Sequence, residues 1–374
     1  MWARRVGALL GVVIALASAA LLWPPPTPEL RLTRWEDHRA EPTDSMRVLW
    51  VGHSLVNHRD PFTEGSEPLP DAVGQLTRAA GLRYEPLEHT LFGASLSLLW
   101  RGEPHSYGRQ EAEVAREGQE LLARAEVDAL VLTEGLPVGR SLDSEHGAYY
   151  AQRFACSVLR RNPDARIYVY ETWSHLHASD PDGDYPRPSA FDWQARITED
   201  RAHWERLADL TATGAVPEPG IGARLRGLLG ESHGCSPRQP VYLVPVGTVF
   251  AAIDELTRRE ELPFADRTLT TADLFANAYT RWPEGWPLEA PLDEEAERRA
   301  LEDLARRHPD AELDDIHPSA LGIYVAALTH FATLYRRTPE GLPSLLDDLP
   351  EETAARLQSL TWRVVRSEAR AGVR

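Results

Sequence analysis

The sequence predicts a doubly wound α/β domain, with a parallel sheet between two layers of helices, over residues 46–340. The strand candidates are short, continuous apolar runs rather than alternating ones, which is typical of a sheet covered on both faces. Helical patterns separate them, and a strand–helix–strand order implies parallel pairing with crossover connections. Ligands of such sheets bind beyond the carboxyl ends of the strands.

The elements follow one another along the whole domain. The strands are expected at 47–52, 128–135, 165–173 and 240–247, with a further extended segment at 83–93. Apolar spacing and helix-end signals such as a closing glycine or Asn-Pro place the helices. The helices are expected at 69–81, 109–126, 144–163, 190–214, 248–260, 293–309 and 318–337.

Both ends of the chain differ from this pattern. Arg4 and Arg5 precede an uncharged apolar run at 6–23, so residues 1–23 are expected to be a signal peptide or a membrane anchor. Bulky residues after the small side chains at 17–19 favour the anchor. Either alternative places the body outside the cytoplasm, in the periplasm or at the cell surface. Residues 24–45 are a Pro-rich linker, and 341–374 are expected to be a helical extension.

Charge and cysteine content narrow the functional class. A net charge of −17 argues against nucleic-acid binding, because phosphates would be repelled. The two cysteines, Cys156 and Cys235, are too few for a structural zinc site. They form one disulfide in an exported protein, or Cys156 is a buried free thiol in its helix. No metal or other cofactor is expected, and membrane contact is expected only through the N-terminal segment.

One serine and one histidine stand where hydrolytic chemistry needs them. The stretch "RVLWVGHSLVNH" (47–58) delivers Ser54 directly after a strand and a glycine. Far along the chain, "DDIHPSALG" (314–322) holds Asp314 three residues before His317, in a loop that enters a helix. A serine nucleophile needs a base within hydrogen-bond reach and a group that orients the base. Ser54, His317 and Asp314 could supply all three roles.

These two stretches resemble the first and last blocks of the SGNH (GDSL-type) hydrolases, Gly-x-Ser-Leu and Asp-x-x-His-Pro. The order and separation match over most of residues 46–340. The resemblance implies a flavodoxin-like three-layer α/β/α fold and a serine esterase or acyltransferase. It assigns Ser54 as nucleophile, His317 as base and Asp314 as the acid that orients it. In "TLFGASL" (90–96) it also assigns Gly93 as an oxyanion donor beside the Ser54 N–H.

The third block departs from the family. The strand ends "VLTEGLPVG" (131–139), with Glu134 in the region of the usual asparagine. Losing such a donor costs about 3 kcal/mol of transition-state stabilisation, so the chain would be a slower, divergent member. Asn57 could supply an amide instead, and His53 replaces the usual aspartate before the serine. Trp173, Glu134 and His53 are the expected substrate contacts, although Trp173 could equally be a core residue.

The favoured function is hydrolysis of an ester, and the expected substrate is an O-acetyl ester on an envelope or extracellular glycan. The same triad would serve a membrane-tethered polysaccharide O-acyltransferase, with a sugar hydroxyl in place of water. A third alternative is a glycan-binding or assembly protein that keeps the fold without turnover. The missing asparagine favours this third alternative, and the complete Ser–His–Asp set argues against it.

Overall fold

A computed structural model gives the structure of the chain. The structure describes residues 41–60, 65–102, 109–176, 178–179, 186–187, 193–213, 216, 237, 239–259, 262–264, 267–277 and 314–373. The predicted segment 1–23, most of the linker 24–45 and the predicted helix 293–309 lie outside these ranges. None of the helices within them is long and apolar enough to cross a membrane.

Five parallel strands form the central sheet, in the order β2-β1-β3-β4-β7. They are β1 (Ser45–Gly52), β2 (Arg83–Thr90), β3 (Ala129–Leu132), β4 (Arg166–Glu171) and β7 (Val241–Pro245). The prediction of a parallel α/β sheet is confirmed, and the strand order is that of flavodoxin-like folds. In this order the direction of winding reverses between β1 and β3, and ligands of such sheets bind at that point, beyond the carboxyl ends.

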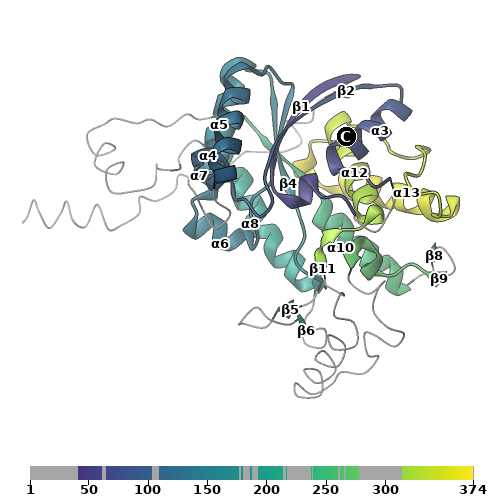
Figure 1. Cartoon of the computed structure of the whole chain (residues 1–374). Coiled ribbons are helices and arrows are strands. Elements are labelled where there is room, and N and C mark those ends of the chain that lie inside the picture. The colour runs from purple at the N-terminus through teal and green to yellow at the C-terminus, as the bar shows by residue number, and fades with distance from the viewer. Residues whose placement is uncertain are drawn as a thin grey trace, which may run out of the picture.

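Helices cover both faces of the sheet (Figure 1). One face packs on α3 (Leu69–Ala79), α10 (Val246–Arg259), α12 (Ala320–Tyr335) and α13 (Glu351–Ser367). The other packs on α4 (Leu96–Arg101), α5 (Arg109–Arg124), α7 (Gly147–Arg161) and α8 (Trp193–Thr213). Successive residues of each strand enter opposite cores, as Val48 and Leu49 of β1 do, because side chains alternate across a strand. That alternation explains why the strands read as continuous apolar runs.

The structure differs from the predicted elements in two helical regions. The helix expected at 144–163 is observed as α7, which begins at Gly147 because His146 takes a left-handed conformation with φ 60°. A separate helix that was not predicted, α6 (Val138–Ser144), precedes it. The extension expected at 341–374 contains α13, whose Leu357 and Leu360 belong to the same core as the sheet. Helix α13 therefore packs as part of the α/β body.

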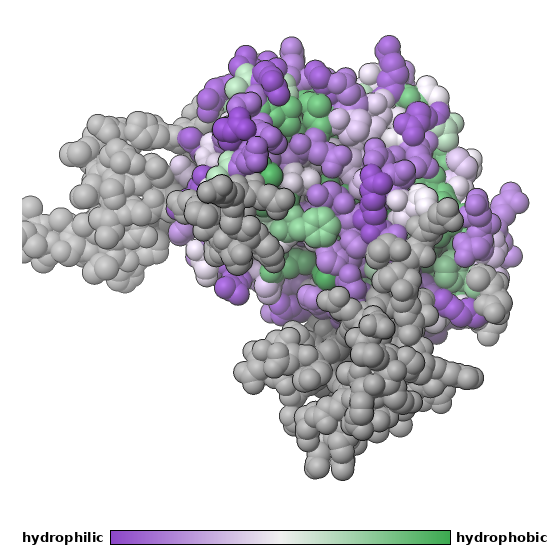
Figure 2. All heavy atoms as spheres, in the orientation of Figure 1, coloured by the Kyte–Doolittle hydropathy of each residue, from purple (hydrophilic) through white to green (hydrophobic). Residues whose placement is uncertain are grey.

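Cys156 is disulfide-bonded, so the free-thiol alternative is wrong. The other cysteine of the sequence, Cys235, lies outside the described residues. The face seen in Figure 2 is mainly hydrophilic, with smaller hydrophobic patches between the polar residues. Among the described residues, Phe92 is the single large hydrophobic side chain that is exposed.

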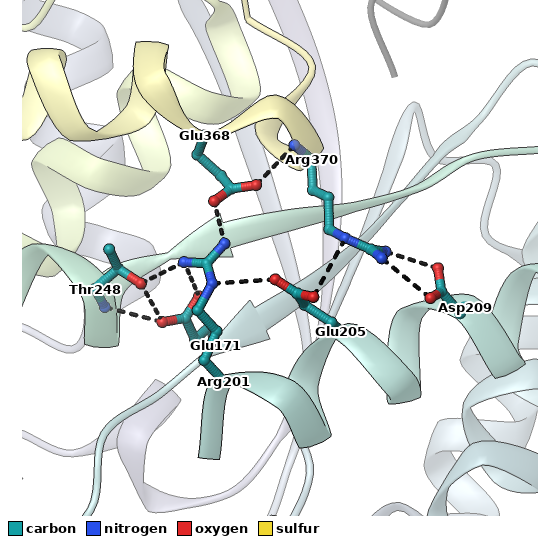
Figure 3. A network of polar contacts seen from close by, with 7 residues as sticks. All are labelled: Glu171, Arg201, Glu205, Asp209, Thr248, Glu368 and Arg370. Carbon is teal, nitrogen blue, oxygen red and sulfur yellow. Dashed lines mark hydrogen bonds and ion pairs between the residues drawn. The ribbon is translucent and has the colours of Figure 1, made fainter. Parts of the chain in front are cut away.

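A partly buried ion-pair network ties the C-terminal segment to the sheet (Figure 3). Glu171, at the end of β4, accepts hydrogen bonds from the Thr248 N–H at 2.9 Å and the Thr248 hydroxyl at 2.6 Å, in the first turn of α10. Arg201 of α8 lies between Glu171 and Glu368, which follows α13. Arg370 continues the network to Asp209, 2.6 Å away. Arg201 therefore offsets part of the cost of burying Glu171, whose pKa burial still raises to about 7, and it links three elements.

Removing that arginine is expected to destabilise the fold. In Arg201→Leu, Glu171 would lose its cation while still buried, so we expect the free energy of unfolding to fall by about 3 kcal/mol. Chemical denaturation followed by circular dichroism measures the loss. The control is Arg116→Leu, since Arg116 pairs with Glu120 at 2.6 Å on an exposed helix face. The control should cost less than about 0.5 kcal/mol. Equal losses in both variants would contradict a special role for the network.

Candidate active site

The turn that carries Ser54 begins where β1 meets β3. Gly52 ends β1, and a Cβ there would lie 2.4 Å from Cγ2 of Thr133, so only glycine permits this close approach. His53 follows as the N-cap of the one-turn helix α2 (Ser54–Asn57). Ser54 is thus the first helical residue, at the carboxyl edge of the sheet beside the β1/β3 switch point. This is the place where ligands of such sheets bind.

His317 lies in a strand rather than in the loop predicted from the sequence. Strand β11 (Asp314–Pro318) pairs antiparallel with β10 (Phe275–Asn277), immediately before α12. The prediction of a loop is therefore wrong. The physical reason is that a strand of this length shows too little alternation to recognise, and its partner is distant in sequence. The pairing fixes the backbone on which the histidine stands.

The structure brings Ser54, His317 and Asp314 into one chain of contacts. The Ser54 Oγ is 2.8 Å from Nε2 of His317. Nδ1 of His317 lies 2.8 Å and 3.0 Å from the two carboxylate oxygens of Asp314. A carboxylate can only accept, so Nδ1 carries the proton, and Nε2 is free to accept a proton from the serine hydroxyl. This is the arrangement that general-base activation of a serine requires.

Asp314 is held as an anion by the residues that it orients. Burial alone would raise the pKa of its carboxyl, but hydrogen bonds from the His317 ring and the His317 backbone N–H, at 3.0 Å, lower the pKa overall. The Asp314 carboxylate therefore fixes both the ring and the backbone of the histidine. Because the pKa of Asp314 is lowered in the folded chain, the stability that its carboxylate contributes is present at neutral pH. This stability is lost as the pH falls through the folded-state pKa.

Two contacts hold β11 and α12 against the body of the domain. The Trp173 indole N–H donates to the carbonyl of Ile316 at 2.8 Å, and the Asp60 carboxylate accepts from the Ala320 N–H at 3.1 Å. Trp173 is only 1 % exposed, and its ring stacks on Phe250 with centroids 4.3 Å apart. The predicted substrate contact at Trp173 is therefore wrong, because the ring is part of the core. Its polar edge positions the strand that carries His317.

Glu134 joins two loops of the site instead of facing substrate. Its Oε1 accepts the N–H of Leu96 at 3.0 Å and of Gly135 at 2.7 Å, and its side chain is fully buried. Its backbone carbonyl accepts from His53 Nε2 at 2.9 Å. The residue thus ties the loop after β2 and the turn before Ser54 to the end of β3. The predicted substrate contact at Glu134 is wrong, since no part of the carboxylate reaches the surface.

His53 acts as a brace between β1 and β3. Its Nε2 donates to Glu134, its Nδ1 accepts the Leu55 N–H at 3.4 Å, and the ring is buried. Burial lowers the pKa of His53 to about 4, so the ring is neutral at physiological pH. The predicted substrate contact at His53 is also wrong, because the described neighbours already engage both ring nitrogens.

The predicted oxyanion donors lie on the two loops that Glu134 connects. Gly93 has φ 66° in the turn after β2, and this turn is fixed by the Leu91 N–H, which donates to the Gly52 carbonyl at 3.1 Å. No hydrogen bond among the described residues uses the N–H of Gly93 or of Ser54. Asn57 ends the same helical turn that begins at Ser54, and its Oδ1 is buried without a partner in the described ranges. Their roles as oxyanion donors stay predictions.

Two aromatic residues beside His317 were not anticipated from the sequence. The His58 ring stacks on the His317 ring, with centroids 4.6 Å apart and planes 18° apart. The Phe92 ring lies 6.1 Å from the same ring, and Phe92 is 51 % exposed. Both residues fall inside stretches already singled out, "HSLVNH" and "TLFGASL". Nothing in the sequence, however, indicates that they meet a histidine more than two hundred positions away.

A second histidine–aspartate pair joins the segment after β4 to Asp315 of β11. His175 Nδ1 is 2.7 Å from the carboxylate of Asp315, and the His175 side chain is largely exposed. In the ranges that the structure describes, no group of three or more His, Cys, Asp and Glu side chains could hold a metal ion.

No protein-family model and no curated protein matches the chain. Solved structures similar to it include a protein assigned as a GDSL-like lipase from Parabacteroides merdae, at 15% identity over 78% of this chain and 96% of that chain, with a TM-score of 0.38. Another is a DUF4886 family protein from Bacteroides uniformis, at 12% identity over 86% and 95% of the two chains, with a TM-score of 0.39.

A third similar structure is a mutant of an acetyl-xylooligosaccharide esterase from Geobacillus, at 12% identity over 50% and 93% of the two chains, with a TM-score of 0.26. The first of these structures carries the name of the GDSL-type family that the sequence resembles. At such identities and TM-scores they do not establish a family for this chain. Its function must be inferred from its own side chains.

The buried Glu134 is expected to make stability depend on pH. Burial raises the pKa of Glu134 to about 7, despite hydrogen bonds from Gly135 and Leu96 that lower it. The folded chain therefore holds this proton more tightly than the unfolded chain, and the associated stability is lost as the pH rises from the unfolded value through about 7. Glu134→Gln keeps the acceptor oxygen and removes this titration.

We expect the free energy of unfolding of Glu134→Gln, relative to that of the wild type, to rise by about 2 kcal/mol as the pH is raised from roughly 5.5 to roughly 8.5. Urea denaturation of both proteins at the two pH values measures the difference. The control is Glu117→Gln, since Glu117 is an exposed carboxyl on α5. The difference in free energy of unfolding between this variant and the wild type should be the same at both pH values. A constant difference between wild type and Glu134→Gln across this range would show that Glu134 does not titrate there.

Proposed function

We propose that the chain is a serine esterase, with Ser54 as nucleophile, His317 as general base and Asp314 as the residue that orients the base. The observation that carries this proposal is the continuous contact from Ser54 Oγ through the His317 ring to the Asp314 carboxylate. A helix-capping serine has no need of an imidazole at 2.8 Å that is itself oriented by a partly buried carboxylate. The backbone N–H groups of Ser54 and Gly93 are the proposed oxyanion donors.

The reaction uses the ring nitrogens of His317 in opposite roles. As Ser54 Oγ attacks the ester carbonyl, Nε2 takes the hydroxyl proton, and Asp314 stabilises the resulting imidazolium through Nδ1. The carbonyl oxygen becomes negative and lies against the oxyanion donors. The proton on Nε2 then passes to the departing alcohol and leaves an acyl-serine. Water, deprotonated by the same nitrogen, releases the acid and restores the serine.

The proposed substrate is an O-acetyl ester on an envelope or extracellular glycan. The expected signal peptide or anchor at 1–23 and the disulfide-bonded Cys156 support a location outside the cytoplasm, where disulfides persist. Such a location brings the site into contact with envelope polysaccharides. Transfer of the acyl group to a sugar hydroxyl would use the same acyl-serine. Added sugar acceptors in the assay distinguish transfer from hydrolysis.

Substitution of the triad is expected to abolish turnover. Ser54→Ala and His317→Ala should each lower kcat on p-nitrophenyl acetate by at least about 1,000-fold, because the nucleophile or the base is lost. Asp314→Asn should be about 10- to 100-fold less damaging, since it disturbs the orientation of the ring more than the proton transfer itself. Steady-state kinetics on the full chain measures these effects.

The matched control is Ser157→Ala, since Ser157 bonds within α7 to the Arg153 carbonyl and takes no part in the site. It should keep wild-type kcat and KM. Circular dichroism confirms that each variant is folded. A folded Ser54→Ala protein with wild-type activity would rule out a serine hydrolase that uses Ser54. A folded wild-type chain without turnover would favour the binding or assembly alternative.

Phe92 is expected to contact the alcohol side of the ester. The leaving oxygen must reach Nε2 of His317, and the exposed Phe92 ring lies beside that imidazole. Phe92→Ala should therefore lower kcat/KM roughly 3- to 10-fold for phenyl or sugar acetates, whose rings can stack, and much less for ethyl acetate. Phe264→Ala, a partly buried aromatic on β8 (Pro263–Phe264), is the control. Equal effects on all three esters would contradict a leaving-group contact.

A further inference from the structure

His58 contacts both members of the proposed nucleophile–base pair. Its backbone N–H donates to the Ser54 carbonyl at 2.7 Å, where it caps helix α2. Its ring stacks on the His317 ring at 4.6 Å, with the two planes only 18° from parallel. One residue therefore fixes the turn that presents the serine and covers one face of the imidazole that the serine needs.

The stack restrains a motion that Asp314 leaves open. The carboxylate contacts Nδ1 at one edge of the His317 ring, and the ring can still tilt about that edge. A tilt would carry the Nε2 lone pair away from Ser54 Oγ, which lies at the opposite edge. A flat ring packed face to face against His317 opposes such a tilt, because parting the two faces opens a gap that nothing fills.

The His58 ring is neutral where the site would work. It is buried, and its Nε2 has no hydrogen-bond partner among the described residues. Burial, with a further contribution from His317, lowers the pKa of His58 to about 4, although Asp314 and Asp60 act in the other direction. A neutral ring does not repel the positive charge that His317 acquires when it takes the serine proton. A lysine or a charged histidine at the same place would repel it.

We propose that His58 is a positioning residue for His317, acting through the face of its ring and not through its ring nitrogens. This inference rests on the proposed function, since it takes His317 as the base. It differs from a purely structural role in what each substitution should change. The flat ring is the feature that matters, so phenylalanine should replace histidine, and a side chain of similar bulk without a ring should not.

The experiment compares His58→Phe, His58→Leu and His58→Ala in the full chain with p-nitrophenyl acetate. We expect His58→Phe to keep kcat within about 3-fold of wild type, and His58→Leu and His58→Ala to lower kcat roughly 10-fold or more, with KM within about 2-fold. The acid limb of the pH–rate profile should coincide for wild type and His58→Phe, because His58 carries no charge there. Thermal denaturation of each variant separates lost positioning from lost folding.

A measurement that needs no turnover completes the test. In the Ser54→Ala background, proton NMR of the Nδ1–H of His317 should give a sharp signal with His58 or His58→Phe and a broadened one with His58→Leu. Wild-type kcat in His58→Ala, or His58→Phe as impaired as His58→Leu, would overturn the proposal. An impaired His58→Phe variant would assign the effect to a ring nitrogen of His58. Absence of Ser54-dependent turnover in the wild type would refute the esterase, while the NMR comparison would still decide the stack.

Discussion

The hydrogen bond between Ser54 and His317 joins residues 263 positions apart, and the rest of the site is arranged to keep it short. Each partner stands on a short element that cannot hold its place alone, a one-turn helix and a five-residue strand. Gly52 lets the serine turn lie against β3, and Trp173 holds the backbone of β11 from the core. Asp60 links the chain after α2 to the start of α12. The contact between Ser54 and His317 thus depends on these three tertiary contacts.

The polar residues buried around this contact position the loops rather than bind substrate. Glu134 uses its carboxylate for the loop after β2 and its carbonyl for His53, so one residue at the end of β3 sets the spacing of both proposed oxyanion loops. His53 and His58 are both neutral because burial disfavours their charged forms. The His317 imidazole, which faces the serine, therefore stacks on a ring without charge. Its counter-charge comes from Asp314 alone among the residues in contact with it.

Two adjacent strands each have a buried glutamate near the carboxyl end, and the two glutamates have different roles. Strands β3 and β4 both end near a buried glutamate, Glu134 and Glu171, and each carboxylate accepts backbone N–H groups of a following segment. Glu171 is compensated by Arg201 and anchors α10 and the C-terminal segment. Glu134 has no such cation among the described residues that contact it. Burial raises the pKa of both carboxyls to about 7. Glu171 and its partners stabilise the fold, whereas Glu134 stabilises the geometry of the active site at some cost in folding free energy.

The sequence by itself determined the fold class and the three residues of the proposed triad. Continuous apolar strands between helices require a sheet covered on both faces, and the motifs around Ser54 and His317 are local patterns that a sequence displays directly. The tertiary structure alone decided what surrounds them. Strand β11, the burial of Trp173, Glu134 and His53, and the stack of His58 on His317 all arise from contacts between segments far apart in the chain. Their energies depend on which surfaces meet, and no local spacing of residues encodes that.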